Sequence, residues 1–272
     1  MKVKDHFLSQ EIFELRDTAI AGVQKTYPVP ADLGSYYDSE DYISHHQDSG
    51  SLKEKLYKFI QNINLKFKKS VLRDFVGNEK TVLDYGCGAG EFLKSIEADY
   101  KTIGYEPHEK ARTAAQKKIK STKIIDDLAL VENDSLDAIT LWHVFEHVEK
   151  QDELLSVFYS KLKTDGKLII AVPNTSSYDA LKYQQHWAAY DVPRHLFHFS
   201  KIGMQNKLKD SSWELIDIKP LMFDSFYISI LSEKYKNSTL FWLKGLLAGT
   251  ISNVKALKNG QYSSLIYIVG KK

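Results

Sequence analysis

The pattern of apolar and polar positions between residues 81 and 269 alternates between two kinds of segment. Short apolar runs rich in β-branched residues are typical of buried strands, and we predict strands at 81–86, 101–106, 123–127, 136–142, 167–172, 213–220 and 262–269. Apolar residues spaced three or four apart predict helices at 91–98, 108–119, 151–162 and 200–209. Such alternation indicates an α/β fold, in which helices cover both faces of a mostly parallel sheet.

An N-terminal arm with a long helix precedes this alternation. The sequence S-L-K-E at 51–54 matches a capping box, and the apolar face that follows predicts a helix ending at Gly77. The other face is rich in lysine, which indicates a solvated surface or, as an alternative, a surface for a polyanion. We therefore divide the chain into an N-terminal helical arm at 1–78 and a main domain at 79–272. Insertions at 174–199 and 224–260 interrupt the main domain.

The turn after the first predicted strand carries three glycines, in the run T-V-L-D-Y-G-C-G-A-G-E-F at 81–92. Glycine lets the backbone turn sharply and lets a ligand approach without meeting a Cβ. A helical pattern resumes at Glu91. A strand, a glycine loop and a helix start in this order predict a cradle of the nucleotide-binding type.

The acidic residues around this loop argue against a dinucleotide ligand. The dinucleotide fingerprint G-x-G-x-x-G needs a glycine where Glu91 stands, and a carboxylate there would repel a pyrophosphate. Asp84 ends the first strand, where it suits an amine, and Glu106 ends the second, where it suits the hydroxyls of a ribose. A ligand with a ribose and an amino-acid head fits both, and a nicotinamide-dependent oxidoreductase is disfavoured.

These motifs resemble those of class I S-adenosylmethionine (SAM) dependent methyltransferases. They are V-L-D-Y-G-C-G-A-G at 82–90, I-G-Y-E-P at 103–107, S-L-D-A-I-T-L-W-H-V-F-E-H-V at 135–148, L-K-T-D-G-K-L-I-I-A-V-P-N at 162–174 and P-R-H-L at 193–196. The resemblance covers roughly residues 81–200. It implies a Rossmann-like, seven-stranded sheet whose last strand inserts antiparallel between the fifth and sixth, with SAM as cofactor and S-adenosyl-L-homocysteine as product.

The resemblance and the strand-end positions together predict the cofactor site. We assign it Asp84, Gly86, Cys87, Gly88, Gly90, Phe92, Glu106, Pro107, Asp127, Leu128 and His143. Cys87 is the only cysteine, so the chain has no internal disulfide, and we assign its thiol no chemistry.

Methyl transfer needs close positioning of donor and acceptor, and a hydroxyl acceptor also needs a base. His143, after the fourth strand, and His195, in the first insertion, are the candidate catalytic residues, although each fits a structural role as readily. Aromatic and polar residues of the arm and the first insertion are the candidates for binding the acceptor: Tyr37, Tyr42, Tyr178, Trp187, Arg194 and His195. The stretch 36–46, with three tyrosines and two histidines, either packs the arm onto the core or covers the active site.

The sequence H-V-F-E-H at 143–147 also fits the H-x-x-E-H pattern of a zinc protease, which needs a long helix. Here the pattern directly follows a strand, so we reject the protease. Some small-molecule and RNA methyltransferases have an E-x-x-E-H metal site in this region, but His143 replaces the first glutamate. We therefore expect no metal, and expect Glu146 and His147 to brace the loop.

Composition adds few constraints. The net charge of +2 gives no strong preference for nucleic acid or membrane, and the charged N-terminus is unlike a signal peptide. The longest apolar run, 241–251, contains Lys244 and is too short to span a bilayer. We expect a cytoplasmic monomer or homodimer.

The sequence thus predicts an enzyme that methylates a small molecule, preferably at oxygen. A non-catalytic SAM-binding regulator or scaffold and a nucleic-acid methyltransferase are the alternatives.

Overall fold

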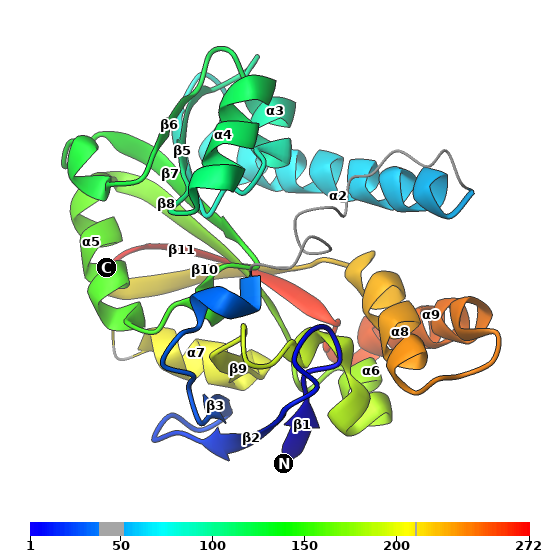
Figure 1. The fold of residues 1–272 in the computed structure, drawn as a ribbon. Helices are drawn as coiled ribbons and strands as arrows, with labels where there is room; N and C mark the ends of the chain where they lie inside the picture. The colour runs from blue at the N-terminus through cyan, green and yellow to red at the C-terminus, as the bar shows by residue number, and fades with distance from the viewer. Residues whose placement is uncertain (38–51, 210) are drawn as a thin grey trace.

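A seven-stranded sheet forms the centre of the computed structural model (Figure 1), which describes residues 1–37, 52–209 and 211–272, with side chains of the first long helix from residue 61 onward. Its strands are β4 (Thr81–Tyr85), β5 (Lys101–Tyr105), β6 (Lys123–Ile125), β7 (Leu136–Trp142), β8 (Leu162–Pro173), β10 (Trp213–Pro220) and β11 (Ser264–Lys271). The spatial order is β10-β11-β8-β7-β4-β5-β6. Strand β11 pairs antiparallel with β8 and β10, and the pairings from β8 to β6 are parallel. The predicted sheet and the antiparallel insertion of its last strand are confirmed.

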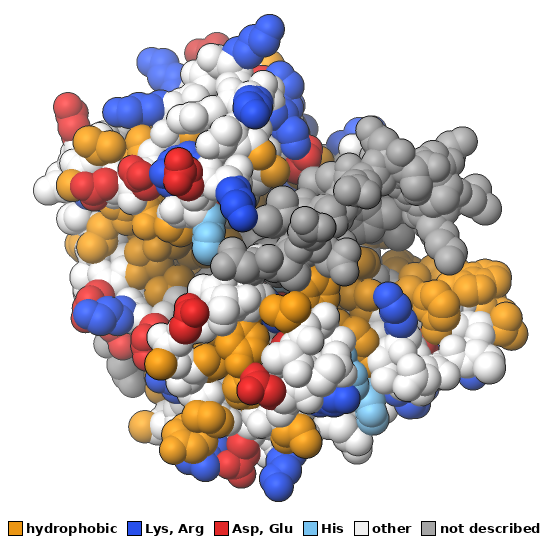
Figure 2. Space-filling model, viewed as in Figure 1, with side chains coloured by type: hydrophobic (Ala, Val, Ile, Leu, Met, Phe, Trp, Pro, Cys, Tyr) orange, Lys and Arg blue, Asp and Glu red, His pale blue; other side chains and the backbone are white. Residues whose placement is uncertain are grey.

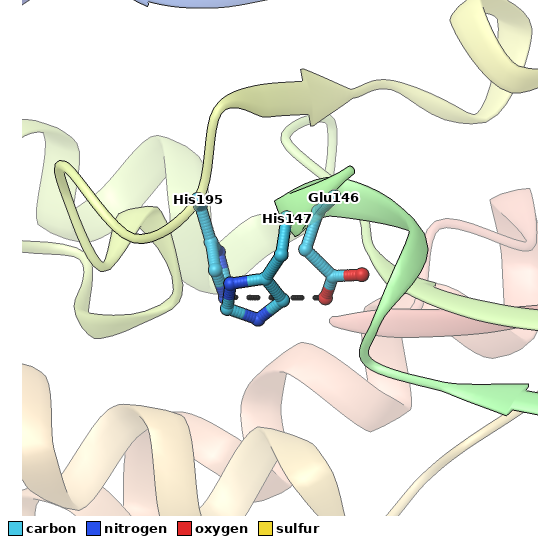
Figure 3. Close-up of side chains that lie close together, drawn as sticks. All are labelled: Glu146, His147 and His195. Atoms are coloured by element: carbon cyan, nitrogen blue, oxygen red, sulfur yellow. Dashed lines mark ion pairs between the residues drawn. The ribbon is translucent and has the colours of Figure 1, made fainter. Parts of the chain in front are cut away.

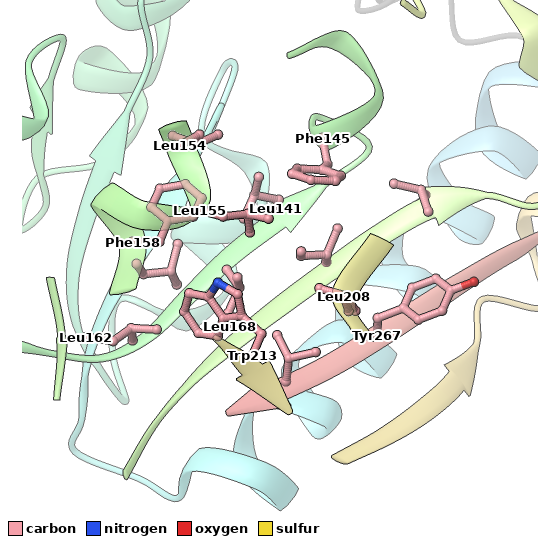
Figure 4. Close-up of a cluster of buried hydrophobic side chains, with 14 of the residues drawn as sticks. Leu141, Phe145, Leu154, Leu155, Phe158, Leu162, Leu168, Leu208, Trp213 and Tyr267 are labelled. Atoms are coloured by element: carbon pink, nitrogen blue, oxygen red, sulfur yellow. The ribbon is translucent and has the colours of Figure 1, made fainter. Parts of the chain in front are cut away.

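Helices cover both faces of this sheet because neighbouring residues of each strand point to opposite sides. One face packs against α5 (Gln151–Lys161) and α7 (Lys201–Lys209), where Phe158 and Leu208 meet Leu168 in the cluster of Figure 4. The other face packs against α2 (Leu52–Val76) and α3 (Glu91–Ile96), through residues such as Leu72 and Ile96. Helix α4 (Glu109–Lys118) packs beside β6. All four predicted helices of the main domain and the long helix of the arm are present.

The first 27 residues differ from the predicted helical arm. They form the strands β1 (Lys2–Lys4), β2 (Ile12–Asp17) and β3 (Val23–Tyr27), which join β9 (Phe197–Phe199) in a second, antiparallel sheet. These strands are short, and β3 pairs with a segment some 170 residues away, so the local pattern does not predict them. Tyr42 and most of the tyrosine- and histidine-rich stretch lie outside the described residues.

The two insertions form a second core beside the small sheet (Figure 1). The first contains α6 (Tyr178–Tyr183), and the second is a hairpin of α8 (Asp224–Tyr235) and α9 (Phe241–Asn259). Tyr183 and Trp187 from the first insertion pack with Ile228 of α8 and Phe13 of β2. Within the described part of the chain, none of the helices has the length and hydropathy needed to cross a bilayer.

Candidate functional site

The edge formed by the carboxyl ends of β4, β5 and β6 is the predicted cofactor side. The chain leaves β4 towards β5 and β6, and later crosses back to β7 on the other side, so strand order reverses between β4 and β7. Ligands of doubly wound sheets bind at such a switch point.

Glu106 is the fixed centre of this cradle. Its side chain is buried, Oε2 accepts a hydrogen bond from the Gly88 amide at 2.9 Å, and Oε1 accepts one from the His108 amide at 2.9 Å. The carboxylate is therefore oriented by the glycine loop on one side and by the start of α4 on the other. Its remaining acceptor capacity suits the two hydroxyls of a ribose.

The three loop glycines have different neighbours. A Cβ on Gly86 would lie 2.7 Å from Val144, and one on Gly90 would lie 2.5 Å from Ile119, so both positions are closed by packing. A Cβ on Gly88 would meet no atom of the described residues within 4 Å. All three have positive φ, which glycine adopts at least cost. Gly88 is thus the glycine that faces open space, where a ligand can approach the backbone.

Asp84 supplies the second acid of the cradle. It is buried, accepts a hydrogen bond from Thr140 Oγ1 at 2.6 Å, and burial raises its pKa to about 7. Lys68 of α2 extends its amino group over the ring of Trp142, 4.8 Å from the centroid. Burial lowers the pKa of Lys68, while Asp224 and Asp84 act in the opposite direction. Lys68 belongs to the lysine-rich face of the arm helix, which the sequence predicted to be solvated. In the structure its amino group points inward beside the cradle.

The other predicted cofactor residues surround or support the cradle. Asp127 caps the short turn Leu128–Leu130 by accepting from the Ala129 amide at 2.8 Å. Phe92 is buried against Trp142, with ring centroids 5.1 Å apart. Cys87 is buried, and burial raises the pKa of its thiol, which keeps it protonated and inert. The residues present fit SAM, with acids for its amine and ribose and an open glycine between them.

His143 begins the other half of the edge, where β7 ends. Its Nε2 lies 2.8 Å from Asp224 Oδ2, and its Nδ1 lies 3.4 Å from Glu146 Oε1. Burial lowers the pKa of His143, but the two carboxylates outweigh it and raise the pKa to about 9. Asn64 of α2 donates to the other oxygen of Asp224 at 3.0 Å. His143 is therefore a charged imidazole held by two carboxylates, and no sequence pattern predicted its partner Asp224.

Glu146, His147 and His195 form a cluster in which one potential ligand atom of each lies within 4.8 Å of the others (Figure 3). Glu146 is 1% exposed, and among the described residues neither of its oxygens has a hydrogen-bond partner. Burial raises the pKa of Glu146, but His143 and the other two histidines outweigh it and lower the pKa to about 2. Burial lowers the pKa of His147 to about 4. The cluster therefore combines an ionised carboxylate with a neutral imidazole.

Both histidines of the cluster are oriented through Nδ1. His147 Nδ1 lies 2.9 Å from the carbonyl oxygen of Arg194, and His195 Nδ1 lies 2.9 Å from that of Ala189. A carbonyl only accepts, so each Nδ1 is the donor in its hydrogen bond, and Nε2 is the nitrogen that is not used in that bond. The Nε2 atom of His195 lies 3.9 Å from Glu146 Oε1.

Tyr37 connects this cluster to the cofactor cradle. Its hydroxyl lies 3.0 Å from His147 Nδ1, and its ring centroid lies 5.6 Å from that of His108, which follows Glu106 and Pro107. The N-terminal segment thus reaches both halves of the edge.

The remaining residues predicted to bind the acceptor are engaged within the protein. The guanidinium of Arg194 is buried and forms ion pairs with Asp5 at 3.0 Å and Asp191 at 2.6 Å. Trp187 is 2% exposed, and its Nε1 donates to Asp179 at 2.7 Å.

Tyr178 at the start of α6 carries the amino group of Lys255 over its ring, 3.8 Å from the centroid. Of the described candidates, the structure therefore brings the side chains of Tyr37 and His195 to the cluster, while Arg194 contributes its carbonyl.

The strand order, the antiparallel last strand and the acidic pair beside an open glycine loop define a Rossmann-like, SAM-dependent methyltransferase. A family model described as a methyltransferase domain matches residues 54–217, more than half of the chain, and the chain belongs to that family.

Other proteins resemble this chain more distantly. A protein of Haemophilus influenzae, described only as uncharacterized, is 24% identical over 189 residues, which cover 64% of this chain and 72% of the relative. Among solved structures, a complex of the Haloferax volcanii Trm112 methyltransferase activator with a protein assigned as a methyltransferase matches with a TM-score of 0.58 at 16% identity. That match covers 79% of this chain and 92% of the other.

Two further structures share the fold. A Thermotoga maritima SAM-dependent methyltransferase, described as a possible histamine N-methyltransferase, matches with a TM-score of 0.54 at 15% identity over 81% of this chain and 95% of the other. Geranyl diphosphate C-methyltransferase from Streptomyces coelicolor, in complex with S-adenosyl-L-homocysteine, matches with a TM-score of 0.50 at 13% identity over 76% of each chain. At these identities the likeness establishes the fold.

Proposed function

We propose that this methyltransferase acts on a small-molecule acceptor and transfers the methyl group to an oxygen. The observation that carries the proposal is the buried cluster of Glu146, His147 and His195, which Tyr37 joins to the cofactor cradle. An acceptor that enters over the ends of β7 and β8 reaches this cluster and the cradle together.

SAM, when bound, supplies an activated methyl group on a sulfonium. That methyl group would pass to the acceptor oxygen as the carbon–sulfur bond breaks with its electron pair going to sulfur, and the hydroxyl proton would pass to a group of the protein. Because the reaction needs donor and acceptor at about 3 Å in line, the rigid placement of Glu106 and Asp84 contributes through positioning.

The two histidines predicted as catalytic have different parts in this proposal. His143 has both nitrogens engaged by carboxylates and a raised pKa, so it is a poor proton acceptor at neutral pH and serves as a positioning residue. His195 directs Nε2 towards Glu146 and is the group that we assign to acceptor activation. This division of roles explains why the chain carries histidines from two distant segments.

The structural neighbours support a small acceptor. One is named for geranyl diphosphate and another as a possible histamine methyltransferase, both of which are small molecules. Asp84 and Glu106 both stand at strand ends suited to the cofactor, which supports retained SAM binding, and turnover distinguishes the enzyme from a SAM-binding scaffold.

The experiment is a methyl-transfer assay with isotope-labelled SAM against a library of phenols, sugars, amines and short nucleic acids, read by mass spectrometry. We expect a labelled ether or ester product from a small hydroxyl or carboxyl compound. Label found only on nitrogen, on carbon or on nucleic acid would contradict the proposed acceptor, and SAM binding without any turnover would favour the scaffold.

A further inference from the structure

We propose that Glu146, His147 and His195 bind a divalent transition-metal ion. One ligand atom of each residue lies within 4.8 Å of the others, and His195 Nε2 lies 3.9 Å from Glu146 Oε1. In a tetrahedral zinc site with bonds of about 2.0–2.1 Å, the ligand atoms are about 3.3 Å apart. Small rotations of the three side chains would therefore close the cluster onto an ion (Figure 3).

The buried carboxylate of Glu146 lacks hydrogen bonds, which is an independent observation at the cluster. The side chain is 1% exposed, and neither oxygen accepts a hydrogen bond from any described residue. Buried polar groups are normally hydrogen-bonded, and a buried carboxylate is normally paired or bound to a metal. The charged His143 lies 3.4 Å from Oε1 and His195 lies 3.9 Å from it, so the carboxylate has a cationic neighbour but keeps acceptor capacity for a ligand bond.

The orientation of the two histidines is the third observation. Each has Nδ1 fixed on a backbone carbonyl, of Arg194 for His147 and of Ala189 for His195. Metal-binding histidines are held in this way, since the hydrogen bond fixes the tautomer and directs the other nitrogen to the metal. The structure therefore places two imidazoles of fixed orientation and one carboxylate close to one another.

The ligand types decide the class of metal. Two imidazoles with one carboxylate suit zinc and its transition-metal neighbours, whereas Mg²⁺ and Ca²⁺ prefer sites made of oxygens. Three protein ligands leave a position open, which an acceptor oxygen can take, and a bound metal lowers the pKa of such an oxygen. With the ion in place, His195 acts on the acceptor through the metal, because its nitrogen is then a ligand and not a proton acceptor. Only this last role rests on the proposed function, because binding of the ion does not depend on the reaction.

The test is calorimetric titration of tag-free, chelator-treated protein with Zn²⁺, Mn²⁺ and Mg²⁺. We expect one Zn²⁺ to bind per chain, Mn²⁺ to bind more weakly, and Mg²⁺ to show no saturable binding. His147→Gln, His195→Gln and Glu146→Gln should each weaken Zn²⁺ binding by at least about 100-fold. His186→Gln removes an imidazole that is outside the cluster and should bind Zn²⁺ as the wild type does. Co²⁺ should give the intense visible absorption of a site with four or five ligands.

Absence of stoichiometric Zn²⁺ binding to the wild type would overturn the proposal. So would cluster variants that bind Zn²⁺ like His186→Gln while they retain the wild-type circular dichroism. If chelation removes the ion and methyl transfer continues at the original rate, the site exists and its role in acceptor activation is wrong. If the protein binds SAM but methylates no acceptor, the proposed function is wrong. The Zn²⁺ titration would still test the metal site independently.

A second inference concerns α9, which buries its small residues and exposes its large ones. The face towards α8 consists of Gly245, Ala248, Gly249, Ser252 and Ala256. A Cβ on Gly245 would lie 2.5 Å from Ile230, and one on Gly249 would lie 2.9 Å from Phe226, so the two helices are in close contact. An ordinary surface helix buries its large apolar residues. Helix α9 leaves them exposed, which indicates a contact with a partner or a membrane.

The exposed face of α9 is apolar and basic. Six large apolar side chains are between 41% and 73% exposed: Trp242, Leu243, Leu247, Ile251, Val254 and Leu257. Figure 2 shows hydrophobic side chains gathered at the α8–α9 end of the molecule. The helix carries Lys244, Lys255 and Lys258, and the sequence from 234 to 272 has no aspartate or glutamate.

We infer that this face of α9 binds the surface of an anionic lipid bilayer. A helix with exposed leucines and a tryptophan, and with lysines beside them, lies in the interface plane of such membranes. The described helices include none that could span a bilayer, so α9 would lie on it. A second copy of the chain fits less well, because two α9 helices would face each other with six lysines and no carboxylate between them. The neighbouring helix α8 begins at Asp224, the partner of His143, so docking would occur next to the site.

The test is flotation of the purified chain with vesicles of phosphatidylcholine alone and with phosphatidylserine added at roughly three parts in ten. We expect binding to the anionic vesicles only, weakened by salt. The pair of changes Leu247→Glu and Leu257→Glu should reduce binding at least about tenfold. The control pair Ile12→Glu and Leu130→Glu alters equally exposed apolar residues elsewhere and should bind normally.

Failure to bind anionic vesicles would overturn this second inference. A concentration-dependent dimer that the α9 pair dissociates, without any vesicle binding, would identify a second copy as the occupant instead. Equal loss of binding in the control pair would mean that the attachment is not specific to α9.

Discussion

The donor edge, at the ends of β4, β5 and β6, and the acceptor edge, at the ends of β7 and β8, are built differently. At the donor edge, some polar contacts join residues two apart, such as Glu106 to His108 and Asp127 to Ala129, and Thr140 reaches Asp84 across 56 residues. At the acceptor edge, Tyr37 meets His147 across 110 residues, and Asn64 meets Asp224 across 160.

The two edges therefore depend on the rest of the fold to different degrees. A strand, its loop and the next helix start place the donor groups by local backbone geometry. The acceptor groups need the N-terminal segment, α2, both insertions and the small sheet to be in place together. We therefore expect changes at the donor edge to affect cofactor affinity alone, and changes at the acceptor edge to affect turnover or stability.

The largest expected effect is on turnover. His195→Ala removes the group assigned to acceptor activation, and we expect the rate of methyl transfer to fall by about 10²–10⁴-fold, the usual range for a lost acid–base group. SAM affinity, measured by calorimetry, should stay within about twofold. A matching loss of SAM affinity would show that the two edges are not separable.

Trp187→Ala should chiefly reduce stability. The side chain is 2% exposed in the second core, so truncation should lower the free energy of unfolding by about 3–5 kcal/mol, as is usual for large-to-small core changes. Urea denaturation provides the measurement. Trp242→Ala, at a tryptophan 49% exposed, is the control and should change it by less than about 0.5 kcal/mol. A fully stable Trp187→Ala with slow turnover would restore the pocket role that the sequence suggested.

Glu106→Ala should weaken SAM binding by about 1–3 kcal/mol, or roughly 5- to 150-fold, because it removes a charged hydrogen-bond acceptor. Glu109→Ala, an exposed carboxylate three residues away, should bind SAM normally. Unchanged affinity of the Glu106 variant in calorimetry would remove this residue from the donor site.

The smallest expected effect is a pH dependence of SAM affinity. Burial raises the pKa of Asp84 to about 7, with Thr140 and Lys68 acting in the opposite direction and Glu106 in the same one. The ammonium group of SAM binds the ionised form, so affinity should be constant above pH 7 and fall by up to about tenfold per pH unit below it. Asp84→Asn should bind more weakly, with no such slope. A flat wild-type profile from pH 5.5 to 8 would mean that Asp84 is already ionised in the free protein.

The sequence alone determined the sheet and the donor edge. Apolar periodicity located all seven strands of the large sheet, and the run 81–92 with Glu106 located the cradle, because each depends on residues near one another in the chain. Sequence also singled out His143 and His195, but it could not say which of them is held by carboxylates.

Only the tertiary structure decided the acceptor edge. It paired His143 with Asp224, brought His195 beside Glu146 and His147, and placed Trp187 and Arg194 in the interior. At the donor edge it turned Lys68 inward beside the cradle. It also formed strands from the first 27 residues, which pair with one another and with β9. The physical reason is that these contacts join segments distant in the chain. The sequence pattern around a residue does not identify a partner that lies far away in the sequence.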